Sequence, residues 1–388
     1  MRISVLLVMT AREVGGAELY VEHLARALQG RVQFTIALPD HPNLRAFTER
    51  LSALAQTHPM PLERPAQWAR VIPNLRRMAR AHDVIHLNSN HPGSRLGIVF
   101  GFTLSGLPAP LVCVEQRASP LSDIRVPRAL TPVLPALFRL SRLKAARIIA
   151  VSRENAELLT RLYGIPPHRI EVVHNAAQLP EMPADYVARE RAAVRVELGL
   201  AMDDRLVLTL ARLAPNKGHR YLVTAVPSVI ARFPSTHFLF AGAPDDRAAI
   251  EQLAAQLNVR DHVHLLGFRT DTARLLAASD LFALPSLAEG MPLSVIEALA
   301  AGLPVVATRV GGIPEIVTPG ENGLLVAPAD SQALAHALLA MLSMDHDTRE
   351  RFRLAARRAA AQFTPEVMAE RTLAVYRRVM QLQSRDDE

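Results

Sequence analysis

The sequence predicts an α/β protein with two doubly wound domains, each a parallel sheet covered by helices, that face each other across a cleft. Short apolar runs alternate with helical segments along most of the chain, which is the pattern of βαβ units. The alternation stops at a polar, proline-containing stretch, 177–196, and then starts again, so we interpret that stretch as a linker. The length of 388 residues also suits two domains, which we place at 1–180 and 195–364.

The composition is that of a globular protein, with 49% hydrophobic and 21% charged residues. Lys and Arg outnumber Asp and Glu by 44 to 37, and the net charge of +7 suits an anionic ligand or membrane surface. The single cysteine, Cys113, lies in an apolar run and predicts a buried thiol. The first residues lack the features of a signal peptide, so we expect a cytoplasmic protein.

The first half of the chain contains apolar runs that we expect to form one parallel sheet. They lie at 2–9, 34–39, 83–89, 110–116, 146–152 and 170–175. Helices are expected at 17–29 and near 68–81. The uncharged run 96–114 is long enough for a membrane span, but its glycines and prolines favour a helix to about Leu104 and a strand from Leu111.

Ligands of doubly wound sheets bind beyond the carboxyl ends of the strands. The pair Gly15–Gly16 lies at the first such end, where glycine permits close approach and a helix N-terminus favours an anion. A plain tight turn is an equal alternative. The polar residues that we expect on the same rim are Asn88, His91, Glu115, Gln116, Arg117, Ser152 and Asn175.

A basic segment, 124–153, contains no Asp or Glu. Its cations are Arg125, Arg128, Arg139, Arg142, Lys144, Arg147 and Arg153, and leucines lie between them. Such a segment can lie on anionic lipid, or it can be a surface helix whose cationic side chains extend from a core-facing stripe. Both interpretations stay open. Its prolines are expected to delay any regular helix until after Pro135.

The second half repeats the alternation and predicts a second parallel sheet. Strands are expected at 205–213, 237–242, 263–268 and 323–328, and helices at 219–233, to about 258, at 271–278 and from about 331 onward. The stretch 280–308 reads as strand, loop, helix and strand. We expect its helix to start with Pro292 in the first turn and to end at Gly302.

The loop and helix of 280–308 carry two carboxylates, Glu289 and Glu297. A carboxylate accepts hydrogen bonds from vicinal hydroxyls, as a sugar site requires. Met291, Leu293 and Ser294 are expected to offer backbone N–H groups to a diphosphate at the helix N-terminus.

Two cations, Arg212 and Lys217, lie in the turn after the strand 205–213. We expect them on the same rim as Glu289, where two positive charges can offset a leaving diphosphate in place of Mg²⁺. A basic surface turn is the plainer alternative for this pair, and a solvated loop or helix surface for the two carboxylates.

The segment from Glu289 to Glu297 resembles the E-x7-E signature of retaining GT-B glycosyltransferases of family 4. The run 212–218 resembles the R-x4-K diphosphate motif of that family. The runs 14–18 (VGGAE) and 310–317 resemble its glycine loops, and all four motifs occur in the family order. The resemblance implies a GT-B fold, a nucleotide-sugar donor, no resident metal or other cofactor, and a last helix, about 365–388, that packs back on the first domain.

The resemblance also implies site roles. Glu289 would bind the donor sugar, Glu297 the ribose, and Arg212 and Lys217 the diphosphate, with Glu289, Arg212 and Lys217 as the catalytic set. The other donor-binding residues would be Gly15, Gly16, Phe268, Gly290, Met291, Leu293 and Ser294. The acceptor, a glycan or lipid-linked molecule, would meet Asn88, His91, Glu115, Gln116 and Arg117.

The chain departs from the family pattern in one loop. The family carries a histidine near the sugar after the strand 110–116, whereas this chain has Glu115, Gln116 and Arg117 there, and Gln116 takes the place of the histidine. Two alternative functions are a GT-B nucleotide-sugar epimerase and a non-enzymatic small-molecule binding protein. We expect no nucleic-acid partner. The triplet Asp345–His346–Asp347 is interpreted as a solvated turn and not as a metal site.

Overall fold

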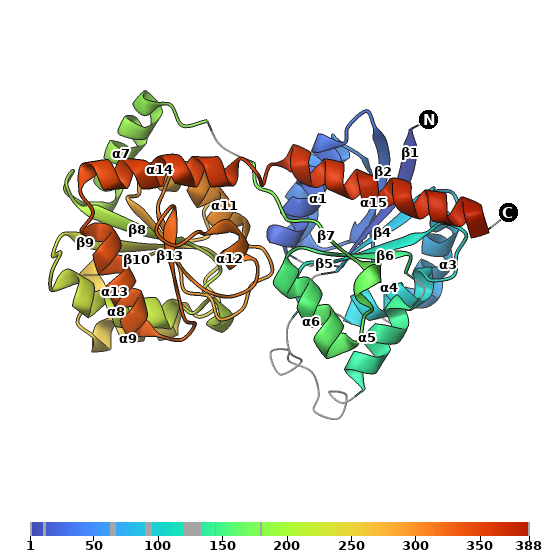
Figure 1. The fold of residues 1–388 in the computed structure, drawn as a ribbon, viewed down its shortest axis with the longest axis horizontal. Coiled ribbons are helices and arrows are strands. Elements are labelled where there is room, and N and C mark those ends of the chain that lie inside the picture. Colours follow the sequence, from blue (N-terminus) through green and yellow to red (C-terminus); the bar gives the residue numbers. More distant parts are fainter. Residues whose placement is uncertain are drawn as a thin grey trace. The chain divides into compact units, whose positions relative to one another are not determined.

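The computed structural model describes residues 2–10, 13–62, 67–89, 95–118, 133–143, 145–178 and 181–386. These residues form two compact units (Figure 1). The first comprises residues 1–176 together with 365–388, and the second comprises residues 177–364. Each unit is a parallel sheet with helices on both faces, so the predicted α/β fold class is confirmed.

The first unit contains a seven-stranded parallel sheet with the order β3-β2-β1-β4-β5-β6-β7. The strands are β1 Ile3–Met9, β2 Val32–Pro39, β3 Gln56–Met60, β4 Val84–Ser89, β5 Leu111–Glu115, β6 Arg147–Ala150 and β7 Ile170–Val172. The helices are α1 Gly16–Ala27, α2 Arg45–Ser52, α3 Trp68–Ala79, α4 Arg95–Leu104, α5 Leu134–Arg142, α6 Arg153–Tyr163 and α15 Pro365–Asp386. The strand order reverses direction between β1 and β4, which creates a switch point there.

The central strands of this sheet are apolar on both faces because helices cover both. Every residue of β4 and β5 is buried. The edge strand β3 was not predicted, because its sequence QTHPM is polar and contains Pro59. Helix α4 and strand β5 follow the expected interruption of the run 96–114. None of the helices in the described ranges is both long and apolar enough to cross a membrane.

The last helix, α15, belongs to the first unit and packs along α1, as Figure 1 shows. Beneath it, the hydroxyl of Tyr376 lies 2.5 Å from Nδ1 of His86 on β4. Both side chains are completely buried, and burial lowers the pKa of His86 to about 3. At the surface, Glu370 of α15 forms an ion pair with Arg31, just before β2. The middle of the helix thus fills part of the core of the first unit.

The second unit contains a six-stranded parallel sheet with the order β10-β9-β8-β11-β12-β13. Its strands are β8 Arg205–Leu210, β9 Thr236–Ala241, β10 Val263–Gly267, β11 Leu281–Leu284, β12 Val305–Thr308 and β13 Gly323–Val326. Its helices are α7 Ala184–Leu198, α8 His219–Ile230, α9 Arg247–Gln256, α10 Thr272–Ala278, α11 Leu293–Ala300, α12 Ile313–Ile316, α13 Ser331–Leu342 and α14 His346–Ala360. Here the order reverses between β8 and β11.

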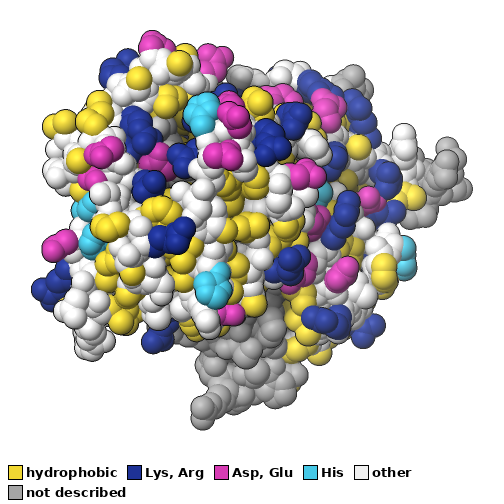
Figure 2. All heavy atoms as spheres, turned by 60° about the vertical axis from the view of Figure 1, so that its left-hand side comes forward, with side chains coloured by type: hydrophobic (Ala, Val, Ile, Leu, Met, Phe, Trp, Pro, Cys, Tyr) yellow, Lys and Arg dark blue, Asp and Glu magenta, His cyan; other side chains and the backbone are white. Residues whose placement is uncertain are grey.

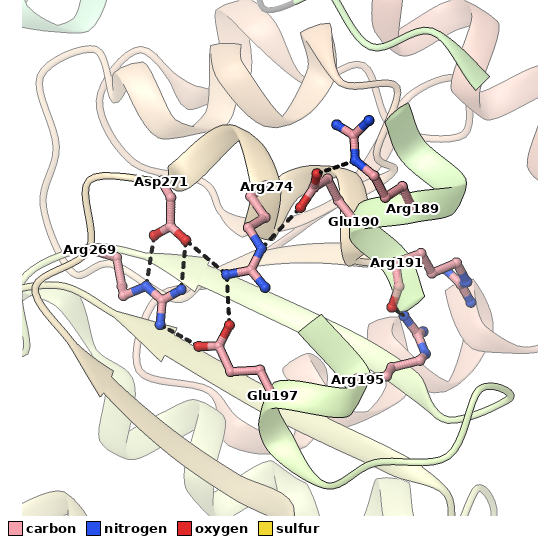
Figure 3. A network of polar contacts seen from close by, with 8 residues as sticks. All are labelled: Arg189, Glu190, Arg191, Arg195, Glu197, Arg269, Asp271 and Arg274. Atoms are coloured by element: carbon pink, nitrogen blue, oxygen red, sulfur yellow. Dashed lines mark hydrogen bonds and ion pairs between the residues drawn. The ribbon is translucent and has the colours of Figure 1, made fainter. Parts of the chain in front are cut away.

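The prediction of a linker at 177–196 is wrong for most of that stretch. From Ala184 onward it forms helix α7, which belongs to the second unit. The helix ends at Gly199, which adopts a left-handed conformation with φ +68°. Ion pairs join α7 to the segment before and within α10 (Figure 3). The side chains drawn there are Arg189, Glu190, Arg191, Arg195, Glu197, Arg269, Asp271 and Arg274.

Arg195 explains how α7 is attached to the sheet of its unit. Its guanidinium is completely buried, donates to the backbone carbonyls of Ala278 and Asp204, and lies 3.3 Å from the carboxylate of Asp280. A buried charge that is paired and hydrogen-bonded in this way holds the elements around it in one arrangement. Polar contacts rather than an apolar stripe therefore fix this helix, and the periodicity of hydrophobic residues gave no indication of it.

The basic segment also differs from the prediction. Helix α5 begins at Leu134, with Pro135 inside its first turn, and not after Pro135. Arg142 is buried, and Arg147 lies 3.7 Å from Glu171, whereas Arg139 and Arg153 are exposed. Arg125, Arg128 and Lys144 lie outside the described residues. Elsewhere, cationic and acidic side chains are interspersed over the face drawn in Figure 2.

Candidate functional site

The switch point of the second sheet brings together the two loops that carry the predicted donor-site charges. The loop after β8 contains Arg212 and Lys217, and the loop after β11 contains Glu289. Strands β8 and β11 are parallel neighbours, so their carboxyl ends lie side by side. The two loops therefore start from adjacent points on one edge of the sheet.

Lys217 and Glu289 form an ion pair across these loops, with Nζ 2.7 Å from Oε1. The hydroxyl of Ser286 donates to the same carboxylate oxygen at 2.6 Å. The side chains of Lys217 and Glu289 are 21% and 7% exposed, so the pair is only partly screened by water. A cation and a hydroxyl-binding carboxylate are thus held within contact of each other at this edge.

Backbone contacts fix the two loops to one another. The N–H of Leu287 donates to the carbonyl of Asn216 at 2.8 Å. Gly218 has φ +68°, and a Cβ on it would lie 2.0 Å from the carbonyl oxygen of Pro285. Only glycine permits both that conformation and that approach. The loop carrying Lys217 is therefore seated directly against the loop carrying Glu289.

A third loop, after β12, closes the same edge. Gly311 has φ +58°, and a Cβ there would lie 2.4 Å from the carbonyl oxygen of Glu289. The N–H of Gly312 donates to the carbonyl of Gly290 at 2.6 Å. The loop 310–312, which carries one of the quoted glycine motifs, thus supports Glu289 and Gly290 from behind.

Helix α11 starts immediately after this junction. Pro292 is the N-cap, with ψ 117°, and not a residue of the first turn as predicted. Leu293 and Ser294 are the first helical residues, whose N–H groups cannot bond within the helix. Met291 is buried at the same corner. Gly302 follows the C-cap with φ +81°, as expected for a helix end.

Glu297 lies one turn into α11 and is half-buried. Loss of hydration raises the pKa of its carboxyl to about 7. Hydroxyl groups that donate to such a poorly hydrated carboxylate stabilise its ionised form more than they would stabilise an exposed carboxylate. The position next to the loop of Glu289 suits a ligand that reaches both carboxylates.

Arg212 and Phe268 lie farther out on the carboxyl side of the sheet. The guanidinium of Arg212 is 54% exposed and lies 3.2 Å from the carboxylate of Asp245, in the loop after β9. Phe268 follows β10 and is 68% exposed. An aromatic ring left in solvent at this edge is available to a flat apolar group of a ligand.

In the first unit, the predicted glycine turn starts helix α1. Gly15 is the N-cap and Gly16 the first helical residue. The N–H of Gly15 donates to Oε2 of Glu18 at 2.8 Å, so this carboxylate, which is 2% exposed, takes one of the donors at the helix N-terminus. Sequence analysis did not identify this role of Glu18, although the Gly-x-x-Glu spacing is that of a capping box.

Glu115 does not belong to the predicted acceptor side. Its side chain is completely buried and forms an ion pair with Arg142 of α5 at 2.7 Å. Burial raises the pKa of Glu115, and the Arg142 cation opposes that effect. Both members are cut off from solvent, so we assign this pair to the core of the first unit.

The other predicted acceptor-side residues that the structure describes lie at the carboxyl edge of the first sheet. Asn88 and Gln116 are buried and hydrogen-bonded to each other at 2.9 Å. Arg117 is half-buried next to Gln116. His91 lies outside the described residues. Ser152 is the N-cap of α6, and its hydroxyl accepts the N–H of Asn155.

The Asp-x-Asp triplet starts a helix instead of forming an isolated turn. Asp345 is the N-cap of α14 and accepts the N–H of Thr348 at 2.7 Å. His346 and Asp347 have highly exposed side chains in the first turn. A capping role accounts for the first aspartate.

Family models match both units of the chain. The model described as Glycosyltransferase Family 4 matches residues 14–179, and the model described as Glycosyl transferases group 1 matches residues 190–359. An uncharacterized glycosyltransferase of Methanocaldococcus jannaschii is 30% identical over 64% of this chain. A D-inositol 3-phosphate glycosyltransferase of Nocardia farcinica is 36% identical over 60% of it. These matches span 64% and 52% of the two relatives.

Solved structures share the fold over almost the whole chain. Anabaena Alr3699/HepE in complex with UDP-glucose has a TM-score of 0.81 and 23% identity, covering 96% of this chain and 99% of that one. WaaG, a glycosyltransferase involved in lipopolysaccharide biosynthesis, has a TM-score of 0.73 and 18% identity, covering 96% and 99%. These likenesses show the GT-B fold, and the two family models, one on each unit, show that the chain belongs to the glycosyltransferases of family 4.

Proposed function

We propose that the protein transfers a hexose-type sugar from a nucleotide-diphosphate sugar to a glycan or lipid-linked acceptor, with retention of configuration. The contact that carries this proposal is the ion pair of Lys217 with Glu289 at the switch point of the second sheet. It places a phosphate-binding cation 2.7 Å from a carboxylate suited to sugar hydroxyls. The complex of Anabaena Alr3699/HepE with UDP-glucose supports a donor of this class.

The proposed roles in the donor site are those that the family resemblance implies, and the chemistry of each group suits its role. Lys217 and Arg212 neutralise the diphosphate as the bond to the sugar breaks, which stabilises the transition state electrostatically. Leu293 and Ser294 offer N–H groups at the start of α11, and the helix dipole adds to them. Glu289 accepts hydroxyls of the sugar and Glu297 those of the ribose. Gly290, Met291, Phe268 and the Gly15–Gly16 turn complete the proposed donor set.

Retention requires the acceptor to attack from the face that the diphosphate leaves. In this front-face route, the bond between the sugar and the diphosphate breaks, and the hydroxyl oxygen of the acceptor forms the new bond to the sugar. The departing phosphate oxygen takes the proton of that hydroxyl. The route needs no nucleophile from the protein, only fixed positions and a stabilised leaving group. It also needs no metal, because the two cations carry the required charge.

We further propose that α5 and the adjoining part of α4 rest on an anionic membrane surface, where a lipid-linked acceptor is found. Five apolar side chains on α4, on α5 and beside α5 are 38–51% exposed. They are Phe102 of α4 and Val133, Leu137, Leu140 and Leu143 on or beside α5. Arg139 and Arg153 are exposed nearby and can pair with lipid phosphates. The similarity to WaaG, a glycosyltransferase involved in lipopolysaccharide biosynthesis, supports an acceptor in bacterial glycolipid or polysaccharide synthesis.

A donor screen tests the proposed reaction. Release of nucleoside diphosphate is measured with common UDP-, GDP- and ADP-sugars, in the presence of a bacterial lipid extract and EDTA. We expect one donor to be turned over and the sugar to appear on an acceptor, with the anomeric configuration of the donor. Conversion of the donor sugar to its epimer would favour the epimerase. Absence of binding to every nucleotide in titration calorimetry would reject the proposal.

A further inference from the structure

Three buried amide side chains form a continuous chain of hydrogen bonds along the carboxyl edge of the first sheet. Nδ2 of Asn175 donates to Oε1 of Gln116 at 3.0 Å, and Nε2 of Gln116 donates to Oδ1 of Asn88 at 2.9 Å. Nδ2 of Asn88 then donates to the backbone carbonyl of Ala17 at 2.9 Å. The three side chains are 3%, 7% and 1% exposed, in the same order. We name this set the amide chain.

The last acceptor fixes the direction of the whole chain. A carbonyl oxygen only accepts, so Asn88 must present its NH₂ group to Ala17 and its oxygen to Gln116. Gln116 must then present its NH₂ group to Asn88 and its oxygen to Asn175. The orientation of each amide is therefore set by chemistry at Ala17, and reversing one amide would place two oxygens against each other.

The chain ends where the proposed donor-side turn begins. Ala17 is the second residue of α1 and directly follows Gly15 and Gly16. Asn88 is the last residue but one of β4, on the other side of the switch point, and Gln116 and Asn175 extend the contacts beyond β5 and β7. The hydroxyl of Thr10, at the end of β1, donates to the carbonyl of Asn88 at 3.3 Å. The amide chain thus connects the strand ends to the first turn of α1.

We propose that Asn88, Gln116 and Asn175 are positioning residues that hold the Gly15–Gly16 turn, which belongs to the proposed donor-binding residues, in its place at the start of α1. This deepens the proposed function, on which it rests for its effect on catalysis. The amide chain itself contains no ionisable group, so it provides the same donors and acceptors at every working pH. Gln116 acts through its neighbours, since both ends of its amide are bonded within the protein.

Gln116→Glu tests the direction of the chain, because the new side chain has nearly the same shape. When protonated, Glu at this position donates its O–H to Asn88 and accepts from Asn175, so the chain stays intact. When ionised, the introduced carboxylate only accepts hydrogen bonds and faces the oxygen of Asn88. Asn88 must then turn its NH₂ group toward the carboxylate, so its contact with Ala17 is lost. Burial raises the pKa of such a carboxyl, so we expect the introduced side chain to pass from its protonated to its ionised form between about pH 5 and about pH 9.

The neighbouring titratable groups are the same in both proteins. They include Glu115 with its partner Arg142, Arg117 next to Gln116, Glu18 at the N–H of Gly15 and His86 on β4. Two further histidines lie beside Asn175: Nδ1 of His23 is 3.1 Å from the carbonyl of Ala176, and Nδ1 of His174 is 3.4 Å from Arg371 of α15. A ratio of variant to wild type at each pH therefore isolates the introduced carboxyl.

Hydrogen–deuterium exchange of the peptide 13–24 measures the turn directly and needs no substrate. We expect exchange in Gln116→Glu to equal that of wild type near pH 5 and to be about tenfold faster near pH 9, as for the loss of a buried hydrogen bond. The ratio of kcat/KM for the nucleotide sugar is expected to fall over the same range. The matched control, Gln33→Glu at an exposed site on β2, should keep both ratios near one.

A pH-independent exchange ratio in folded Gln116→Glu would overturn the proposal. If that variant does not fold above pH 5, Asn175→Asp makes the same test at the other end of the chain. Failure of both to fold near pH 5 would also overturn it, because the protonated side chains preserve every bond. If no nucleotide sugar is turned over, the proposed function fails while the exchange result still decides the role of the chain.

Discussion

The two sheets have the same strand order around their switch points, but different chemistry at their carboxyl edges. In the second unit, Lys217 and Glu289 face each other in loops that remain partly open to solvent. In the first unit, the corresponding edge carries the neutral amide chain, and its charged neighbours Glu115 and Arg142 neutralise each other in the core. One topology therefore supports a charged edge for binding and a neutral edge for positioning.

This difference separates two kinds of ion pair. The Glu115–Arg142 pair is completely buried, so water cannot replace either charge as a partner, and we expect the pair to act on stability. The Lys217–Glu289 pair can exchange its internal contact for a ligand, because a diphosphate offers Lys217 a second anion. We expect breaking the first pair to destabilise the first unit, and breaking the second to lower turnover.

Arg142→Ala should have the largest effect. Removing the cation leaves Glu115 buried without its partner, and we expect the free energy of unfolding of the first unit to fall by about 3–5 kcal/mol. Urea denaturation followed by circular dichroism measures it. Arg139→Ala, an exposed cation on the same helix, should change stability by no more than about 0.5 kcal/mol. Equal effects of the two variants would contradict the assignment of Glu115 to the core.

Lys217→Ala should lower kcat/KM by about 10²–10³-fold, a typical cost of removing one electrostatic contact to a transition state. Its melting temperature should remain close to that of wild type, because the pair is partly solvated. Arg353→Ala, at an exposed cation on α14 of the same unit, is the control for loss of positive charge. A stability loss without a loss of turnover would reverse the proposed contrast with Glu115 and Arg142.

Leu140→Asp tests whether the outer helices of the first unit meet lipid. Sedimentation with vesicles containing anionic lipid should show about tenfold weaker binding than for wild type, since an exposed apolar contact is replaced by a like charge. Leu354→Asp on α14 is the matched control, because both leucines are 51% exposed. Binding that is equally weak for both variants, or equal to wild type for both, would remove the membrane from the proposal.

The pH dependence of donor binding should be the smallest effect. The pKa of Glu297 is raised to about 7, so the carboxylate becomes available to ribose hydroxyls as pH rises through that value. We expect the affinity of wild type for the nucleotide sugar to increase a few-fold between about pH 6 and pH 8. A nucleotide sugar is used because the terminal phosphate of a nucleoside diphosphate titrates in this range. Glu297→Gln should show a flat profile, and the same slope in both would exclude Glu297.

The sign of the effect on stability is opposite to that on binding. The pKa of Glu297 in the folded protein is above its ordinary value of 4.5, so the folded state holds this proton more tightly than the unfolded state does. The contribution of Glu297 to stability is therefore largest below pH 4.5 and decreases as pH rises toward 7. Melting temperatures of wild type and Glu297→Gln across this range separate the two effects.

Much of the fold could be predicted because buried parallel strands are short apolar runs between helices. Strand β3 and helix α7 could not, since both are fixed by features that hydrophobic patterns do not record. Strand β3 is a polar edge strand whose position depends on pairing with β2. Helix α7 depends on ion pairs to α10 and on the buried guanidinium of Arg195.

The site shows the same limit. The position of Arg212 and Lys217 after one strand, and of Glu289 after its neighbour, could be predicted from the order of motifs. Their partners Ser286 and Asp245 could not, because a serine or aspartate in a loop carries no signal of what it contacts. Nor does a run of arginines reveal that Arg142 turns inward to Glu115.

The position of α15 has a consequence for the way the protein is made. The second unit is one continuous stretch of chain, whereas the first needs a helix that leaves the ribosome only after the whole of the second. Until then the place of Tyr376 beside His86 is empty and the part of α1 that α15 contacts is uncovered. The order of synthesis is therefore not the order of completion, and the nascent first unit is the part that a chaperone would meet with exposed core surface.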